Sequence, residues 1–313
     1  MKIAFVFPGQ GSQAVGMGMD VAENFEAARK VYEKAGEILG FSLMDLITNG
    51  PAEELTRTHN TQPAVVATSI ALMEVLREQG FECVMTAGHS VGEFAALYCA
   101  GALSLESCID LTRARGSYMN EAGEKYPGTM SAIMGLELPQ LEEVCQKASE
   151  KGVVVVANLN NPGQLVISGS IEGVREAERI ALESGAKKVF PLSVSAAFHS
   201  PLMDEAAEKL AEKLDSVKFS DCRIPVVSNV TAEPVMDGEN MRQLMKKQIS
   251  SRVYWEKSIK SMIDEGIELF IEIGPGTALA GMIKKIDRKA EVMNFNNMAS
   301  LQKILEKFDK IPA

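Results

Sequence analysis

The chain has 313 residues, of which 46% are hydrophobic and 24% are charged, and its formal net charge is −10. This is the composition of a globular protein that buries a large core in one or two domains. The negative charge argues against a nucleic-acid-binding surface, because the basic residues do not cluster. Five scattered cysteines without a C-x-x-C pair predict reduced thiols rather than disulfides or metal ligands. The apolar run at residues 3–7 is too short for a signal peptide or a membrane span, so we expect a cytoplasmic protein.

The first part of the chain alternates predicted strands and helices. Continuous apolar runs rich in β-formers indicate buried strands of a parallel sheet, and glycine-rich or polar stretches separate them from the helices. This alternation is typical of an α/β sheet. The predicted elements are strands at 3–7 and 81–87 and helices at 20–39, 43–47, 51–55 and 64–79.

A G-x-S-x-G motif at residues 88–92 follows the second predicted strand. A serine in this motif lies on a sharp turn between a strand and a helix, where a Cβ on either flanking residue would clash with nearby backbone. The stretch 93–100 contains good helix formers, so strand, serine and helix occur in the required order. This context favours Ser90 as a nucleophile over the alternative, a plain turn of small residues.

An arginine lies next to the apolar stripe of the following helix. Ser104 is expected to cap this helix, which extends to about residue 122. Arg115 falls at the edge of the stripe, whereas Arg113 projects away from it. A guanidinium turned inward is costly unless an anion pairs with it, so Arg115 indicates either an internal salt bridge or an anionic substrate.

The segment from residue 129 to 194 has the order β-α-β-β-α-β, which is the split βαβ arrangement of ferredoxin-like folds. We therefore predict an α/β-hydrolase-like large domain with a mostly parallel sheet, formed by residues 1–127 and 196–313. A small ferredoxin-like (βαββαβ) subdomain at 128–195 interrupts it. After this subdomain we expect strands at 224–229, 269–273 and 291–295 and helices at 201–217, 241–249, 255–264 and up to about residue 286.

A serine hydroxyl is a poor nucleophile at neutral pH and needs a base within hydrogen-bond reach, usually a histidine. His89 directly precedes Ser90 and diverges from it on the turn. His59 lies in a polar stretch that is expected to be a surface loop. His199 follows the last strand of the predicted subdomain, at a seam between domains where ligand sites concentrate. We expect His199 to be the base rather than a structural histidine.

The oxyanion that forms during acyl transfer needs hydrogen-bond donors already in place. One expected donor is the backbone N–H of Val91, which follows the nucleophile near a helix N-terminus. The second is expected from the loop 9–11, because the carboxyl ends of parallel strands share one edge of a sheet.

These residues stand in stretches that resemble the malonyl-CoA:acyl carrier protein transacylases of type II fatty acid synthesis. The resemblance covers almost the whole chain in the expected order, which makes it specific. The matching stretches are Phe5–Gln13, Thr61–Ala64, Gly88–Glu93, Arg115-Gly116, Phe198-His199 and Glu272–Gly276.

The resemblance implies a role for each candidate residue. Ser90 would be the acylated nucleophile, His199 the base and Arg115 the clamp for the malonyl carboxylate. The backbone N–H groups of Gln10 and Val91 would form the oxyanion hole.

The resemblance also implies that a main-chain carbonyl, at Gln248, orients the histidine in place of an acid. Truncation of the Gln248 side chain is therefore expected to be mild. Related polyketide acyltransferase domains that use malonyl carry His-Ala-Phe-His, and residues 196–199 read Ala-Ala-Phe-His. The first position departs from that pattern, but Phe198 is kept, and its bulk would resist a methyl-branched acyl group.

The activity implied by the resemblance is ping-pong transfer of malonyl from malonyl-CoA to the phosphopantetheine thiol of holo-acyl carrier protein. It implies no metal and no cofactor beyond the coenzyme A thioester substrate. We expect a monomer with no nucleic-acid or membrane partner. The alternatives are a stand-alone acyltransferase of a polyketide synthase, a serine hydrolase (thioesterase or esterase) and a non-catalytic carrier-protein module.

Overall fold

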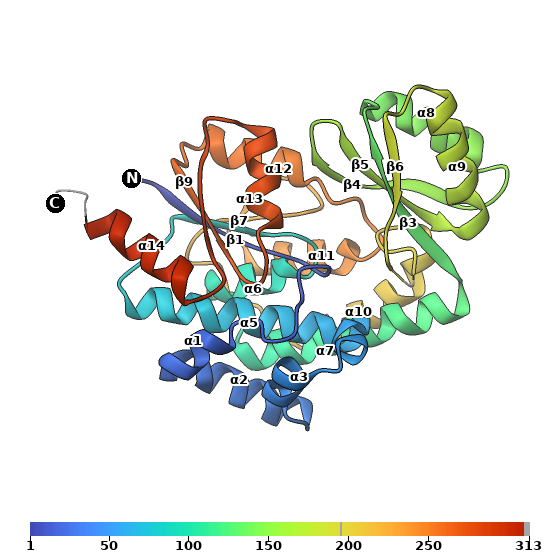
Figure 1. The fold of residues 1–313 in the computed structure, drawn as a ribbon. Helices are drawn as coiled ribbons and strands as arrows, with labels where there is room; N and C mark the ends of the chain where they lie inside the picture. The colour runs from blue at the N-terminus through green and yellow to red at the C-terminus, as the bar shows by residue number, and fades with distance from the viewer. Residues whose placement is uncertain (195, 310–313) are drawn as a thin grey trace.

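The computed structural model describes residues 1–194 and 196–309, which form two β-sheets surrounded by helices (Figure 1). The larger sheet contains, in spatial order, β10 (Glu291–Phe295), β9 (Leu269–Ile273), β1 (Ile3–Phe7), β2 (Met85–Gly88), β7 (Val226–Val227) and β8 (Pro234–Val235). Its strands pair in parallel except for β8 at the edge. The smaller, antiparallel sheet contains β4 (Val154–Asn161), β5 (Gln164–Ser170), β3 (Gly128–Met134) and β6 (Lys188–Pro191).

Helices cover both faces of the larger sheet and one face of the smaller sheet (Figure 1). The helices before the smaller sheet are α1 (Met19–Asn24), α2 (Glu26–Leu39), α3 (Leu43–Asn49), α4 (Ala52–Thr56), α5 (Thr58–Glu78), α6 (Gly92–Cys99) and α7 (Leu105–Lys125). Within the smaller sheet's segment are α8 (Leu138–Ala148) and α9 (Ile171–Glu183). After it come the 3₁₀ turn η1 (Pro201–Met203), α10 (Asp204–Asp215), α11 (Gly238–Gln248), α12 (Trp255–Asp264), α13 (Ala278–Ile286) and α14 (Met298–Asp309).

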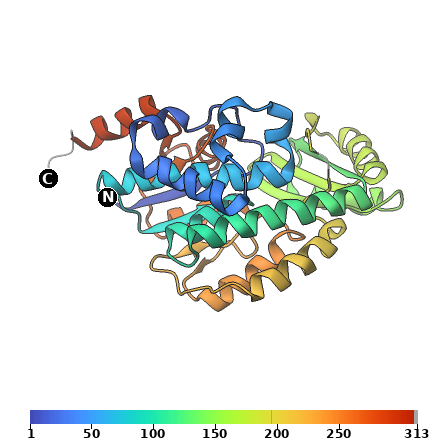
Figure 2. The same cartoon turned by 90° about the horizontal axis from the view of Figure 1, so that it is seen from below.

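The predicted α/β fold, with a mostly parallel sheet and a small ferredoxin-like sheet, is confirmed. Strand β1 lies in the middle of the larger sheet and all of its residues are buried. Helices α5 and α7 pack against each other, and α7 reaches from the larger sheet to the foot of β3 (Figures 1 and 2). The division into domains at 1–127, 128–195 and 196–313 stays a prediction, and positions 195 and 310–313 lie outside the described residues.

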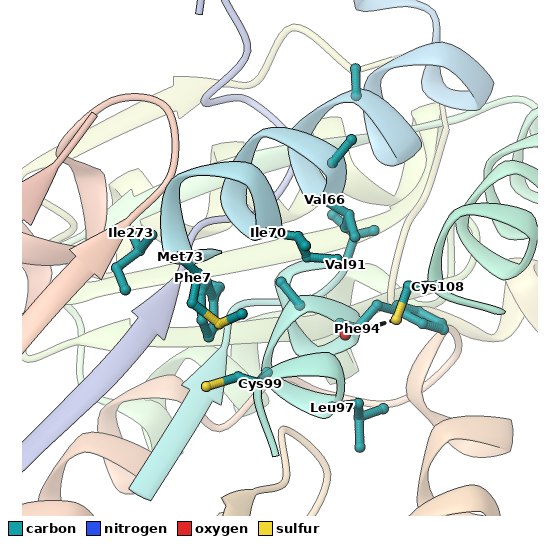
Figure 3. Close-up of a cluster of buried hydrophobic side chains, with 14 of the residues drawn as sticks. Phe7, Val66, Ile70, Met73, Val91, Phe94, Leu97, Cys99, Cys108 and Ile273 are labelled. Atoms are coloured by element: carbon teal, nitrogen blue, oxygen red, sulfur yellow. Dashed lines mark hydrogen bonds between the residues drawn. The ribbon is translucent and has the colours of Figure 1, made fainter. Parts of the chain in front are cut away.

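A buried apolar cluster supports the turn after β2. Figure 3 shows Val91, the N-cap of α6, and Phe94 of α6 beneath Val66 and Ile70 of α5, while Phe7, at the end of β1, lies by Met73 of the same helix. The side chains of Phe7, Val66, Ile70, Val91 and Phe94 are all fully buried. The packing of the first turn of α6 therefore fixes the position of the residue that precedes it, Ser90.

The G-x-S-x-G segment forms the tight turn that the motif predicts. Ser90 has a φ of 51°, a left-handed conformation that is strained for a residue with a Cβ. A Cβ added to Gly88 would lie 2.0 Å from the carbonyl carbon of Gly92. A Cβ on Gly92 would lie 2.3 Å from the carbonyl oxygen of Phe7. Both glycines are needed because backbone packs directly on backbone here.

Helix α5 starts six residues earlier than predicted and contains Pro63 in its interior. A proline cannot donate the helical hydrogen bond to the carbonyl four residues before it, here the carbonyl of His59. Arg113 of α7 supplies the missing donor, because its Nη1 donates to the His59 oxygen at 2.8 Å. The expectation that His59 lies in a surface loop is therefore wrong: it is half-buried in the first turn of α5.

Other differences arise where the chain turns or where its apolar pattern is short. The predicted helix at 20–39 is divided at Phe25, which is extended. The predicted strand at 224–229 shortens to the two residues of β7, because the chain then turns back to pair with β8. Helix α14 is not predicted from the sequence. No helix in the described part of the chain has both the length and the apolar character needed to cross a membrane.

We expect Gly92→Ala to lower the free energy of unfolding by about 2–3 kcal/mol, because the new methyl would meet main-chain atoms that cannot move aside. Gly281→Ala is the matched control, since its Cβ would have no heavy atom within 4 Å and it lies inside α13. That change should leave stability unaltered or raise it by about 0.5–1 kcal/mol. Urea unfolding of both variants measures the difference, and equal stabilities would contradict the packing argument.

Candidate active site

A cavity of about 280 Å³ opens where the carboxyl ends of β1 and β2 face the smaller sheet. Ser90, Arg115 and His199 all line it, together with the loop from Pro8 to Ser12. Most of its remaining wall is apolar and comes from the smaller sheet, from the chain that follows β6, and from α7 and α13. These apolar residues are Met119, Met130, Ala132, Val166, Leu192, Val194, Phe198, Ala278, Leu279 and Met282.

Ser90 and His199 are in hydrogen-bond contact, with 2.8 Å between Ser90 Oγ and His199 Nε2. The other ring nitrogen, Nδ1, lies 3.0 Å from the carbonyl oxygens of both Gln248 and Ser251. Because carbonyl oxygens only accept hydrogen bonds, Nδ1 must carry the ring proton. The lone pair on Nε2 then faces the serine hydroxyl, which is the tautomer that a general base requires.

The imidazole of His199 is held in its neutral form. Burial, with the nearby positive charge of Arg115, lowers the pKa of His199 to about 3. The two carbonyls bear no full charge and so stabilise an imidazolium less than a carboxylate would. His199 also has a φ of 58°, so nucleophile and base both sit on left-handed backbone, which is typical of sites whose geometry is set by the surrounding fold.

Arg115 is fully buried, and in the described part of the chain its guanidinium donates only to neutral groups. Nη1 donates to Gln62 Oε1 at 2.8 Å. Nη2 donates to Gln248 Oε1 at 2.9 Å and to Ser90 Oγ at 3.1 Å. Burial lowers the pKa of Arg115 to about 9, so the group stays cationic at neutral pH. The sequence allowed either an internal salt bridge or an anionic substrate. Within residues 1–194 and 196–309 Arg115 forms no direct salt bridge, and it lines the cavity.

Of the two residues expected to supply the oxyanion hole, Val91 directly follows Ser90 as the N-cap of α6, and Gln10 lines the same cavity as Ser90. Among residues 1–194 and 196–309, neither the Gln10 nor the Val91 backbone N–H is paired with an acceptor. The loop that carries Gln10 packs closely against the turn at Ser90. A Cβ added to Gly9 would lie only 2.5 Å from the carbonyl oxygen of His89. The Gln10 side chain is turned toward α5, where its oxygen accepts from Gln62 Nε2 at 3.3 Å.

The comparisons with known proteins bear on this geometry. The family model described as "Acyl transferase domain" matches residues 4–309. The malonyl CoA-acyl carrier protein transacylase of Bacillus subtilis (strain 168) is 45% identical over 96% of this chain and 95% of its own length. The chain belongs to this acyl transferase family.

Solved structures of relatives agree with the assignment. The acyl carrier protein S-malonyltransferase of Vibrio cholerae superposes with a TM-score of 0.94 at 39% identity, over 97% of this chain and 100% of that one. A malonyl-transacylase solved in complex with a type II PKS acyl-carrier protein gives a TM-score of 0.95 at 37% identity, over 98% and 100%. These likenesses span both sheets of the acyltransferase fold.

The Gln248 main-chain oxygen accepts from His199 Nδ1 as expected, but the side chain of Gln248 also makes contacts that the sequence did not indicate. Its side-chain oxygen accepts from Arg115, and its Nε2 donates to the Ser90 carbonyl at 2.8 Å and to Glu93 Oε2 at 2.6 Å. The side chain therefore ties the arginine, the turn and a buried acid together. Removing it would leave several buried polar groups without partners, which is costly rather than mild.

Phe198, His89 and Val91, which the sequence analysis also considered, lie at different positions around the site. Phe198 lines the cavity. His89 is bonded through Nε2 to Asn160 Oδ1 at 2.9 Å and so is engaged away from Ser90. Val91 is buried as the N-cap of α6.

Three polar residues of the site are not identified from the sequence. Asn229 accepts from the Ser90 N–H at 2.7 Å and donates to the Gly88 carbonyl at 2.6 Å, so it holds the chain that enters the turn. Asn229 ends the predicted strand 224–229, at the edge of the sheet that holds the other site residues. This position could have indicated a site residue from the sequence. Glu93 carries a different signal, since it is the one charged residue in the otherwise mostly apolar helix α6. Gln62 follows four polar residues at the start of α5, so its position gives no such signal.

We expect the reactivity of Ser90 to be nearly independent of pH between 8 and 5, because His199 is already neutral there. A base with an ordinary pKa near 6.5 would lose about 30-fold over that range. The rate constant for inactivation by phenylmethylsulfonyl fluoride, which carries no titrating group, measures this directly. A change below about threefold is expected, and a fall above tenfold centred near pH 6.5 would contradict the depressed pKa. Ser90→Ala, which should form no adduct by mass, controls for the site of reaction.

Proposed function

We propose that this acyltransferase moves the malonyl group from malonyl-CoA to the phosphopantetheine thiol of holo-acyl carrier protein, through a malonyl ester on Ser90. The observation that carries the proposal is a buried cation at the nucleophile: the Nη2 of Arg115 lies 3.1 Å from Ser90 Oγ, in a largely apolar cavity. A generic ester pocket has no use for such a charge, whereas an acyl group with its own carboxylate does.

In the first half-reaction Ser90 Oγ attacks the thioester carbonyl while His199 Nε2 takes the hydroxyl proton. The backbone N–H groups of Gln10 and Val91 hold the oxyanion of the tetrahedral intermediate. Collapse of the intermediate breaks the C–S bond, and His199 returns the proton to the departing thiolate. The products are the malonyl-Ser90 ester and free coenzyme A.

In the second half-reaction the phosphopantetheine thiol replaces coenzyme A and the steps run in reverse. His199 removes the thiol proton, the sulfur attacks the ester carbonyl, and the proton passes to Ser90 Oγ as the ester bond breaks. His199 accepts and returns every proton that is transferred in the two half-reactions. The scheme therefore needs no cofactor beyond the coenzyme A thioester. We also propose that the protein is a cytoplasmic monomer.

Arg115 selects the acyl group in this scheme. A guanidinium binds a carboxylate through two parallel hydrogen bonds, and in an apolar cavity these are stronger than in water. Its present contact with Ser90 Oγ would be exchanged for the malonyl carboxylate as the ester forms. Phe198 lies in the cavity wall, where a methyl branch on the acyl group would meet its ring.

We expect Arg115→Ala to lower kcat/KM for malonyl-CoA by about 100-fold or more while acetyl-CoA is affected much less. The matched control is Arg113→Ala on the same helix, which removes a guanidinium that serves the His59 carbonyl outside the cavity. It should lower stability without changing the malonyl-to-acetyl ratio. Steady-state transfer to holo-carrier protein gives both constants, and an equal loss for the two substrates would count against the clamp.

Hydrolysis is the competing activity for the same serine. Incubation with malonyl-CoA alone should give a stable acyl-enzyme, seen as one added malonyl group by intact mass and absent from Ser90→Ala. Addition of holo-carrier protein should then discharge it onto the carrier. Rapid release of free malonate without transfer would overturn the proposal in favour of a thioesterase.

A further inference from the structure

Glu93 is a buried carboxylate in contact with the active site but outside its cavity. It lies in the first turn of α6, is 1% exposed, and directly follows the G-x-S-x-G motif. Among the described residues, those that line the cavity include Ser90 and Arg115 but neither Glu93 nor Gln248. Any influence of Glu93 on the acyl group must therefore pass through a neighbour.

That neighbour is the Gln248 amide. Glu93 Oε2 accepts from Gln248 Nε2 at 2.6 Å, and the same nitrogen donates to the Ser90 carbonyl at 2.8 Å. The amide oxygen is thereby turned to Arg115 Nη2, 2.9 Å away. If the amide were turned over, its NH₂ would face a guanidinium that only donates, and its oxygen would face two acceptors. The carboxylate fixes which end of the amide meets the arginine.

The charges of Glu93 and Arg115 are also linked through the Gln248 amide. In the described part of the chain the guanidinium donates to no carboxylate, and Glu93 is the one acidic group whose charge raises the pKa of Arg115 against the effect of burial. Arg115 in turn helps to lower the pKa of Glu93, which burial raises to about 7. A polarised amide between a carboxylate and a guanidinium holds the cation in place without neutralising it by a direct ion pair.

We propose that Glu93 is a positioning residue that sets the selectivity of Arg115 for a carboxylate-bearing acyl group by fixing the Gln248 amide. This rests on the proposed function, in which Arg115 binds the malonyl carboxylate. A direct Glu93–Arg115 ion pair would compete with the substrate for the guanidinium. The intervening amide occupies one N–H of Nη2, and the other N–H, which donates to Ser90 Oγ, stays on the cavity side.

The other oxygen of Glu93 has a separate task, which makes glutamine an informative replacement. Oε1 accepts from the Asn229 backbone N–H at 3.1 Å, so the carboxylate serves two donors. In Glu93→Gln a single oxygen must serve both, and the charge is lost while the shape is kept. Glu272→Gln is the matched control, because Glu272 is also buried and also accepts two N–H groups, those of Leu279 and Ala280, at the start of α13.

The experiment measures kcat and KM for malonyl-CoA and acetyl-CoA in transfer to holo-carrier protein, using the full chain. For Glu93→Gln we expect the malonyl KM to rise about tenfold with a smaller change in kcat, and acetyl-CoA to change less than about threefold. Glu272→Gln should leave the malonyl-to-acetyl ratio of kcat/KM unaltered. A parallel loss for both substrates, or no change in either, would overturn the positioning role.

A second variant keeps the inference testable if Glu93→Gln does not fold. Gln248→Met removes the amide but keeps the main-chain oxygen for His199, and it must also lower the malonyl-to-acetyl ratio; an unchanged ratio overturns the inference. In the double variant Glu93→Gln/Gln248→Met, the malonyl-to-acetyl ratio should fall by less than the product of the two single-variant falls. Both substitutions act on the same Gln248–Arg115 contact, so their effects are not independent. A wild-type protein that fails to transfer malonyl would instead refute the proposed function, so the two failures are distinguishable.

Discussion

The backbone of Gly92 lies against the carbonyl oxygens of Phe7 and Pro8, and the rest of the site depends on this contact. It brings the start of α6 close to the ends of β1 and β2, so that Ser90 has no space to relax from its left-handed conformation. The loop that carries Gln10 and the N–H of Val91 are brought to the same point. Asn229, two residues after β7, completes the arrangement by bonding the Ser90 N–H and the Gly88 carbonyl.

A second property of the site is that its charges are held at a distance from one another. Arg115 is buried among amide and hydroxyl oxygens, and the closest acid acts through Gln248. His199 is oriented by two carbonyls instead of a carboxylate. A buried cation that is hydrogen-bonded but not neutralised keeps its attraction for an incoming anion, because the low dielectric of the cavity does not screen it.

The fold and the reactive pair could be predicted from the sequence because local patterns encode them. Each apolar run and the G-x-S-x-G segment is a continuous stretch of sequence. The glycines of that segment indicate by themselves a turn too tight for a Cβ. The contacts of the Gln248 side chain, Glu93 and Asn229 could not be assigned, since their partners lie between 133 and 158 residues away along the chain. Helix α5 was placed too late because Pro63 normally marks a helix start, and only the remote Arg113 compensates for it.

The pair of carbonyls that accept a hydrogen bond from the Nδ1–H of His199 has a consequence for the direction of catalysis. A carboxylate there would stabilise the imidazolium and make the histidine slow to give its proton up. With neutral partners the protonated ring is short-lived, and it can deliver its proton to whichever sulfur is leaving. Both half-reactions exchange a thioester for an ester at the same serine and differ only in the thiol. The site is thus built for reversible exchange, in which the supply and removal of the two thiols, rather than the enzyme, decide the net flow of acyl groups.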